Sequence, residues 1–192
     1  MTTNRQEPPK KEPELSWVDS HCHLEDSQFN DDRPGVLERA RQAGVHFMVT
    51  LGSDILSSRK AVDLAESLDS VFAGIGIHPH EAKKAGRRTF STLTKLAGKP
   101  KVVAIGEVGL DHHWPAKLIL EKGGTEEVHR QCLDAQVRVF EHWIAQAHQL
   151  GLPLVVHERE AHALARQVLD GCVLRPHRVM FHCFGSDAAA AA

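Results

Sequence analysis

Histidine and carboxylate side chains recur at the ends of short apolar runs along this chain. The sequence contains 14 histidines and no tyrosine, and histidine is both the commonest metal ligand and a frequent general acid or base. The residues that end or directly follow an apolar run are His21, His23, His78, His80, Glu107, Asp111, His157 and His182. Because the carboxyl ends of parallel strands converge at one edge of a sheet, this pattern predicts a cluster of ligating groups there.

Two features of this set favour a metal site. His21 and His23 are two residues apart, so in an extended chain both imidazoles point to the same side and can bind one cation. Glu107 can bridge two cations through its two carboxylate oxygens. Histidines together with carboxylates suit Zn, Mn, Fe or a weaker Mg site. Any one of these histidines alone is better explained as a surface or capping residue, and it is their recurrence at one edge that indicates metal binding.

Six short apolar runs supply the strands that must position these groups. They span residues 15–18, 45–51, 71–77, 102–105, 152–156 and 179–181. Several are apolar without alternation, which is typical of parallel strands buried on both faces. Amphipathic segments predict helices at about 31–43, 57–68, 125–150 and 160–170. Strand alternating with helix predicts a parallel α/β fold.

The composition is that of an ordinary globular domain. The 192 residues carry a formal net charge of -2, with 42% hydrophobic and 25% charged residues, which excludes collagen-like, disulfide-scaffold and largely disordered proteins. No apolar run approaches the roughly 18 residues of a membrane helix, and no apolar stretch resembles a signal peptide. The four cysteines are far apart and are expected to be free thiols. We therefore expect a cytoplasmic protein with no membrane association and no obligate protein partner.

Basic residues concentrate between Ala82 and Lys101, where there is no acid. The seven are Lys83, Lys84, Arg87, Arg88, Lys95, Lys99 and Lys101. Two interpretations stay open: a solvated helix face, or an electrostatic guide for a phosphate backbone, because the stretch follows the loop that carries His78. Arg159, two residues past His157, could meet a phosphate directly.

At these residues the chain resembles the TatD family of metal-dependent deoxyribonucleases. The matching segments, in the family's order, are Asp19–Leu24, Gly76–His80, Gly106–Asp111, Leu152–Arg159 and His182–Phe184. The resemblance implies a TIM-type (β/α) barrel of the metallo-dependent hydrolase kind, with about six of eight βα units present. It also implies hydrolysis of phosphodiester bonds in DNA, as an exonuclease, with two divalent metal ions (Mg, Mn or Zn).

Roles for individual residues come with this resemblance. The expected metal ligands are His21, His23, Glu107, His157 and His182. Glu107 and His78 are the expected catalytic residues, and the expected substrate-binding residues are Arg159, Asp111 and His80, with Asp111 also supporting the site. Two cations about 3.5–4 Å apart would activate a water for in-line attack on phosphorus, so no side-chain nucleophile is required.

The chain departs from the family pattern towards its C-terminal end. A complete barrel takes about 250 residues and eight strands, and the family's last metal ligand, an aspartate ending strand eight, has no counterpart here. We expect a mobile tail over 1–14, a partial barrel domain over 15–187, and an alanine run over 188–192 that is a helix start or a truncation scar. Two other functions stay open: a hydrolase of C–N or C–O bonds in small molecules, and an inactive truncated product that binds metal.

Overall fold

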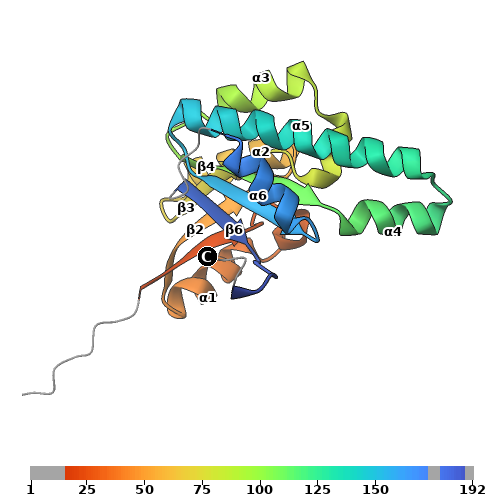
Figure 1. Ribbon diagram of the computed structural model, residues 1–192. Helices are drawn as coiled ribbons and strands as arrows, with labels where there is room; N and C mark the ends of the chain where they lie inside the picture. Colours follow the sequence, from red (N-terminus) through yellow and green to blue (C-terminus); the bar gives the residue numbers. More distant parts are fainter. Residues whose placement is uncertain (1–15, 173–177, 189–192) are drawn as a thin grey trace, which may run out of the picture.

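The computed structural model of the protein describes residues 16–172 and 178–188 (Figure 1). The tail expected over residues 1–14 and the alanines beyond residue 188 lie outside these ranges. Within them, no helix combines the length and the apolar character needed to cross a membrane.

Six strands form one sheet whose spatial order is the order of the sequence. They are β1 (Trp17–Cys22), β2 (Val45–Leu51), β3 (Val71–Ile75), β4 (Val102–Asp111), β5 (Leu154–Arg159) and β6 (Val179–His182). Every neighbouring pair is parallel, which confirms the predicted α/β fold. The sheet curves into a nearly closed barrel whose two edge strands are β1 and β6 (Figure 1).

Helices connect the strands and pack on the outside of the sheet. The α-helices are α1 (Arg33–Gln42), α2 (Ile55–Ser67), α3 (Arg87–Leu96), α4 (His113–Lys122), α5 (Glu126–Leu150) and α6 (His162–Asp170), with short 3-10 helices η1 (Ser27–Phe29) and η2 (Pro79–Lys84). The helix predicted over 125–150 is α5. Its first turn is capped by the side chain of Thr125, and Gly151 ends it in the left-handed conformation, at φ 69°.

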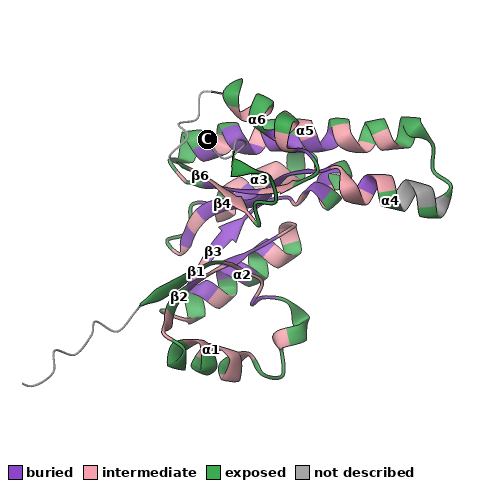
Figure 2. Cartoon of the chain, turned by 60° about the horizontal axis from the view of Figure 1, so that its bottom comes forward, coloured by how far each residue is buried: buried purple, intermediate pink, exposed green. Residues whose placement is uncertain are grey.

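Several elements differ from the sequence-based expectation; β1, for example, spans Trp17–Cys22 where the sequence predicts a strand over 15–18. α2 begins at Ile55, ahead of the predicted start at Ser57, because the Asp54 carboxylate caps it by accepting from the Ser57 N–H at 2.7 Å. α4 is an additional helix, and with the first half of α5 it forms a helical hairpin that projects beyond the barrel (Figures 1 and 2). β4 continues well past its predicted end at Ile105, because its pairing with β5 runs on to Asp111.

The core lies between the sheet and the helices that cover it. α5 buries Phe140 and Trp143 completely, and Figure 2 shows that its buried part is the part lying over the sheet. β4 is buried along nearly its whole length, as expected for a central strand of a parallel sheet. β1 differs, because Trp17 and Val18 are 55% and 59% exposed. The most rigidly packed strand therefore carries Glu107 and Asp111.

Candidate metal centre

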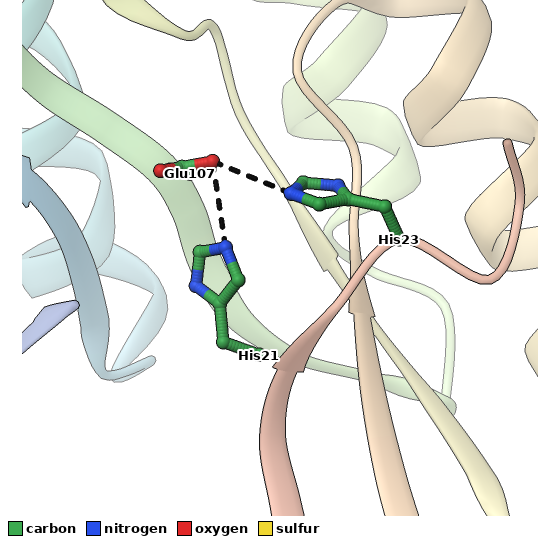
Figure 3. A group of neighbouring side chains, drawn as sticks. All are labelled: His21, His23 and Glu107. Atoms are coloured by element: carbon green, nitrogen blue, oxygen red, sulfur yellow. Dashed lines mark ion pairs between the residues drawn. The ribbon is translucent and has the colours of Figure 1, made fainter. Parts of the chain in front are cut away.

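Glu107 lies at the centre of the histidine cluster, and its two carboxylate oxygens face different partners. The residue is 4% exposed. Its Oε2 lies 3.5 Å from Nε2 of His21 and 3.7 Å from Nε2 of His23, and Figure 3 shows both rings turned towards this oxygen. The two rings, at the end of β1, have centroids 5.2 Å apart, on the same side of the chain as their spacing predicts.

The other oxygen of Glu107 faces a second pair of histidines. Its Oε1 lies 2.8 Å from Nδ1 of His157 and 4.0 Å from Nε2 of His78. The nitrogens of His78 and His157 are themselves 3.3 Å apart. β3, β4 and β5 are adjacent in the sheet, so their carboxyl ends bring these three side chains together.

Asp111 holds two histidines of the cluster, His157 and His80, in place. It is fully buried, and its Oδ2 accepts from Nε2 of His157 at 3.1 Å and from Nε2 of His80 at 3.0 Å. Its other oxygen accepts from the backbone N–H of Trp114. The amide of Gln136 bonds to both the N–H and the C=O of Asp111 and so holds its backbone. Asp111 therefore orients two histidines, and its own position is fixed by burial and by the hydrogen bonds from Gln136.

Hydrogen bonds also orient His23. Its Nδ1 donates to the carbonyl of Leu51 at 2.8 Å, which leaves the Nε2 lone pair directed at Glu107. A buried carboxylate, Glu25, lies 3.5 Å from the same Nδ1 and accepts from the hydroxyl of Thr50. Glu25 is not among the predicted site residues. It lies in the turn after β1, where the two-residue spacing of an extended chain no longer applies.

His78 carries its proton on the opposite nitrogen from His23. Its Nδ1 accepts from the backbone N–H of His80 at 3.2 Å, so that nitrogen holds no proton. The neutral ring must therefore carry its proton on Nε2, which faces His157 and Glu107. Burial lowers the pKa of His78 to about 3, so the ring is neutral at physiological pH.

Two ionised carboxylates dominate the electrostatics of the cluster. Burial acts to raise the pKa of Glu107, but hydrogen bonds from His157 and His21 outweigh it and hold that pKa well below its usual range. Burial of Asp111 is likewise outweighed by hydrogen bonds from His157 and His80, so its pKa is also lowered. For His157, burial is outweighed by these two carboxylates, which raise its pKa to about 9. The cluster therefore presents negative charge to a cation at neutral pH.

His182 and Arg159 complete the set of predicted residues. His182 pairs with His157 across β5 and β6, and its ring stacks on His21 with centroids 3.5 Å apart. Burial and the neighbouring His21 lower the pKa of His182. Arg159 lies at the end of β5 and lines, with His157 and His182, a hollow of about 840 Å³. All the predicted site residues thus lie at one edge of the sheet, with Arg159 at its rim.

The donor atoms of this cluster fit divalent cations. Two groups of three residues, one of His21, His23 and Glu107 and one of His78, Glu107 and His157, each have ligand atoms within 4.8 Å of one another. Imidazole nitrogen with carboxylate oxygen suits Zn, Mn or Fe, and Mg more weakly. Histidines that bind metals usually donate their other ring N–H to a carboxylate or carbonyl, and Asp111 is such an acceptor for His157. One buried carboxylate, Glu107, is common to both groups.

Comparison with known proteins gives consistent matches. A sequence model of the family described as TatD related DNase matches residues 18–192. A protein named uncharacterized metal-dependent hydrolase TatD, from Mycobacterium tuberculosis, is 37% identical over 91% of this chain and 63% of its own length. A 3'-5' ssDNA/RNA exonuclease TatD from Pantoea vagans is 36% identical over 86% of this chain and 59% of its own length.

A solved structure agrees with the sequence matches. The crystal structure of YjjV, a TatD homologue from Escherichia coli, superposes with a TM-score of 0.77 at 25% identity, covering 91% of this chain and 62% of the other. This match supports the barrel fold. The chain spans about three fifths of the length of the relatives it matches.

Proposed function

This chain belongs to the TatD-related DNase family, and we propose that it hydrolyses phosphodiester bonds in DNA with the help of two divalent cations, Mg, Mn or Zn. Relatives are named metal-dependent hydrolases or 3'-5' ssDNA/RNA exonucleases, which supports this class of reaction. The exonuclease mode and the preference for DNA are part of the proposal. The cytoplasmic location that the sequence predicts stays a prediction.

One observation carries the proposal: the two oxygens of Glu107 face two separate groups of histidines. Oε2 faces His21 and His23, and Oε1 faces His157 and His78. A carboxylate that is buried, ionised and shared in this way is suited to bridge two cations. Two cations held close together are the arrangement that phosphodiester hydrolysis uses.

We assign the metal ligands from the orientation of the rings and, for His182, from the resemblance to the family. His21, His23 and Glu107 would hold one cation, and Glu107, His157 and His182 the other. His157 would bind through Nδ1 once a cation displaces the proton that this nitrogen shares with Glu107, because Asp111 accepts the proton of Nε2. His78 lies within reach of the second group, but its Nε2 carries the proton. We therefore place His78 beside the cations as a hydrogen-bond donor rather than as a ligand.

Bound divalent cations would lower the pKa of a water and offset negative charge on the phosphate. The chain's own residues would position the substrate. The Nε2–H of His78, which faces His157 at 3.3 Å, would donate to a phosphate oxygen once a cation occupies Nδ1 of His157. The guanidinium of Arg159 is placed to pair with a neighbouring phosphate. Asp111 and Gln136 would keep His157 and His80 in position, and His80 lies on the substrate side.

The proposal is tested by nucleotide release from 3'-labelled single-stranded DNA, with Mg²⁺ or Mn²⁺ added and with EDTA as the metal-free control. We expect metal-dependent release from the wild-type chain and none from Glu107→Gln. Hydrolysis of small amides or lactones without release of nucleotides would overturn the DNase assignment in favour of a small-molecule hydrolase. Binding of metal without hydrolysis of either substrate would favour the inactive, metal-binding product.

A further inference from the structure

A pocket of about 670 Å³ opens beside the metal centre, between η2 and the hairpin of α4 and α5. Its walls are mainly apolar and, among the described residues, include Pro79, Trp114, Pro115, Val128 and Cys132. Pockets of this size with apolar and aromatic walls are typical of sites for small rings. The function proposed above assigns no role to this pocket.

Trp114 supplies the aromatic surface of the pocket. It is only partly buried, in contrast to Trp143, which is completely buried in the core. The ring of Trp114 contacts the rings of His80 and His113 edge to face, with angles between the ring planes of 80° and 88°. Among the described residues no ring stacks parallel to Trp114, and the ammonium group of Lys117 lies over one face of its ring. A large aromatic ring left partly exposed in a pocket is suited to stack on a ligand.

Positive charge lies next to this aromatic surface. The ammonium group of Lys117 is 4.8 Å from the centroid of the Trp114 ring, and Lys83 lines the pocket from η2. Both are positioned to neutralise a ligand that carries an anionic group beside an apolar ring. An acidic side chain, Glu81, also lines the pocket, and it is paired with Lys84 at 2.6 Å. An aromatic surface combined with basic side chains is the usual arrangement for binding single-stranded nucleic acid.

The pocket adjoins the metal centre at His80. This residue lines the pocket, and its ring centroid lies 5.8 Å from that of Trp114. On its other side, Nε2 of His80 donates to Asp111, which also holds His157. A ring seated against Trp114 would therefore lie one side chain away from the residues that face the cations.

We propose that this pocket binds a nucleobase of the DNA strand whose phosphate reaches the Glu107 cluster, with Trp114 as the stacking surface. The inference rests on the proposed function, because it assigns a base subsite to the same substrate. Stacking on a π-face is tolerant of sequence, so the subsite favours single-stranded over paired DNA without selecting a particular base.

Fluorescence anisotropy tests the proposal with two 5'-labelled single-stranded oligonucleotides of equal length, one of thymidines and one wholly abasic. Phosphorothioate linkages in both strands limit hydrolysis, while added Mn²⁺ keeps the proposed cation sites filled. The wild-type chain is expected to bind the thymidine strand about five- to hundredfold more tightly than the abasic strand, the range associated with one stacked base. Trp114→Leu should abolish this difference, and Trp114→Phe should retain part of it.

Trp17→Leu is the matched control, because Trp17 is 55% exposed at the start of β1, the end of the sheet opposite the site. It should leave the difference between the strands unchanged. If Trp114→Leu, with a native circular dichroism spectrum, still prefers the thymidine strand as the wild type does, the subsite is overturned while the DNase function stands. If the wild type binds neither strand with Mn²⁺ present, the subsite is overturned, and the nucleotide-release assay described above decides the DNase function separately.

Discussion

The imidazole rings of His21 and His182 stack on each other, with centroids 3.5 Å apart and an angle of 14° between their planes. His21 belongs to the first strand and His182 ends the sixth, so the two lie at opposite edges of the sheet. Their contact requires the sheet to curl until its edge strands meet at the site. Glu107, from the middle of the sheet, then lies within reach of both sides of the cluster.

Replacing Glu107 should remove the group that both cation sites share. We expect Glu107→Gln to weaken Mn²⁺ binding by more than the roughly 10- to 100-fold that removal of a supporting residue causes. Added Mn²⁺ should raise the melting temperature of the wild type but not that of the variant. Isothermal titration calorimetry and thermal melts measure both effects, with the exposed Glu38→Gln as the control. Unchanged stoichiometry and affinity in Glu107→Gln would exclude a bridging role.

Asp111 should act through the histidines it holds. We expect Asp111→Asn to lower metal affinity by about 10- to 100-fold, because an amide accepts less strongly than a carboxylate from His157 and His80. The measurement is a Mn²⁺ titration of folded protein, with turnover at saturating Mn²⁺ as a second reading. Recovery of turnover at saturation would support a positioning role. A defect that saturating Mn²⁺ cannot restore would instead indicate direct contact with substrate.

His78 and His157 should respond differently to substitution, because we propose His78 as a hydrogen-bond donor and His157 as a metal ligand. His78→Ala is expected to keep the wild-type number of cations while lowering turnover by roughly 100-fold, as removal of a positioned proton donor does. His157→Ala should bind one cation fewer per chain. Metal analysis after gel filtration, combined with single-turnover assays, distinguishes the two. A missing cation in His78→Ala would make that residue a ligand.

Gly109 is required by the close approach of β4 and β5. It has φ 141°, and a Cβ there would lie 2.1 Å from the carbonyl oxygen of His157. Gly109→Ala should lower the free energy of unfolding by about 2 to 6 kcal/mol, from backbone strain together with overpacking. Gly98→Ala is the control, because its Cβ would make only ordinary contact and the change should stay within about 1 kcal/mol. Urea denaturation measures both, and equal effects would refute the steric argument.

The basic stretch divides between the two ends of the molecule. Arg87 and Arg88 begin α3 directly after η2, at the site end, whereas Lys95 and Lys99 lie towards the opposite end, where Lys99 pairs with Glu66. Neutralising Arg87 and Arg88 to Gln should weaken single-stranded DNA binding and reduce its salt slope by about 0.7 for each phosphate that the protein no longer neutralises. The same change at Lys95 and Lys99 removes equal charge and should have little effect. Equal weakening from both pairs would show that only net charge matters.

Local sequence determined most of the helices and strands. The spacing of apolar residues between Thr125 and Gly151 predicts α5, and the apolar run 45–51 coincides with β2. These features depend on residues near one another in the chain, through periodicity, capping and burial. The predicted start of α2 is wrong because it leaves out the Asp54 cap, although that signal is also local. α4 is harder to predict because it begins directly after β4, without a connecting loop.

The sequence by itself determined which residues gather at the site, because parallel strands end at a common edge and each strand end carries its own histidine or carboxylate. Only the tertiary structure decided which of these residues contact one another. The opposite tautomers of His23 and His78, the burial of Asp111 beneath His157, and the pocket around Trp114 all depend on contacts between distant segments. Spacing along one strand cannot specify such contacts, because they arise from how far the sheet curls and how the helices pack against it.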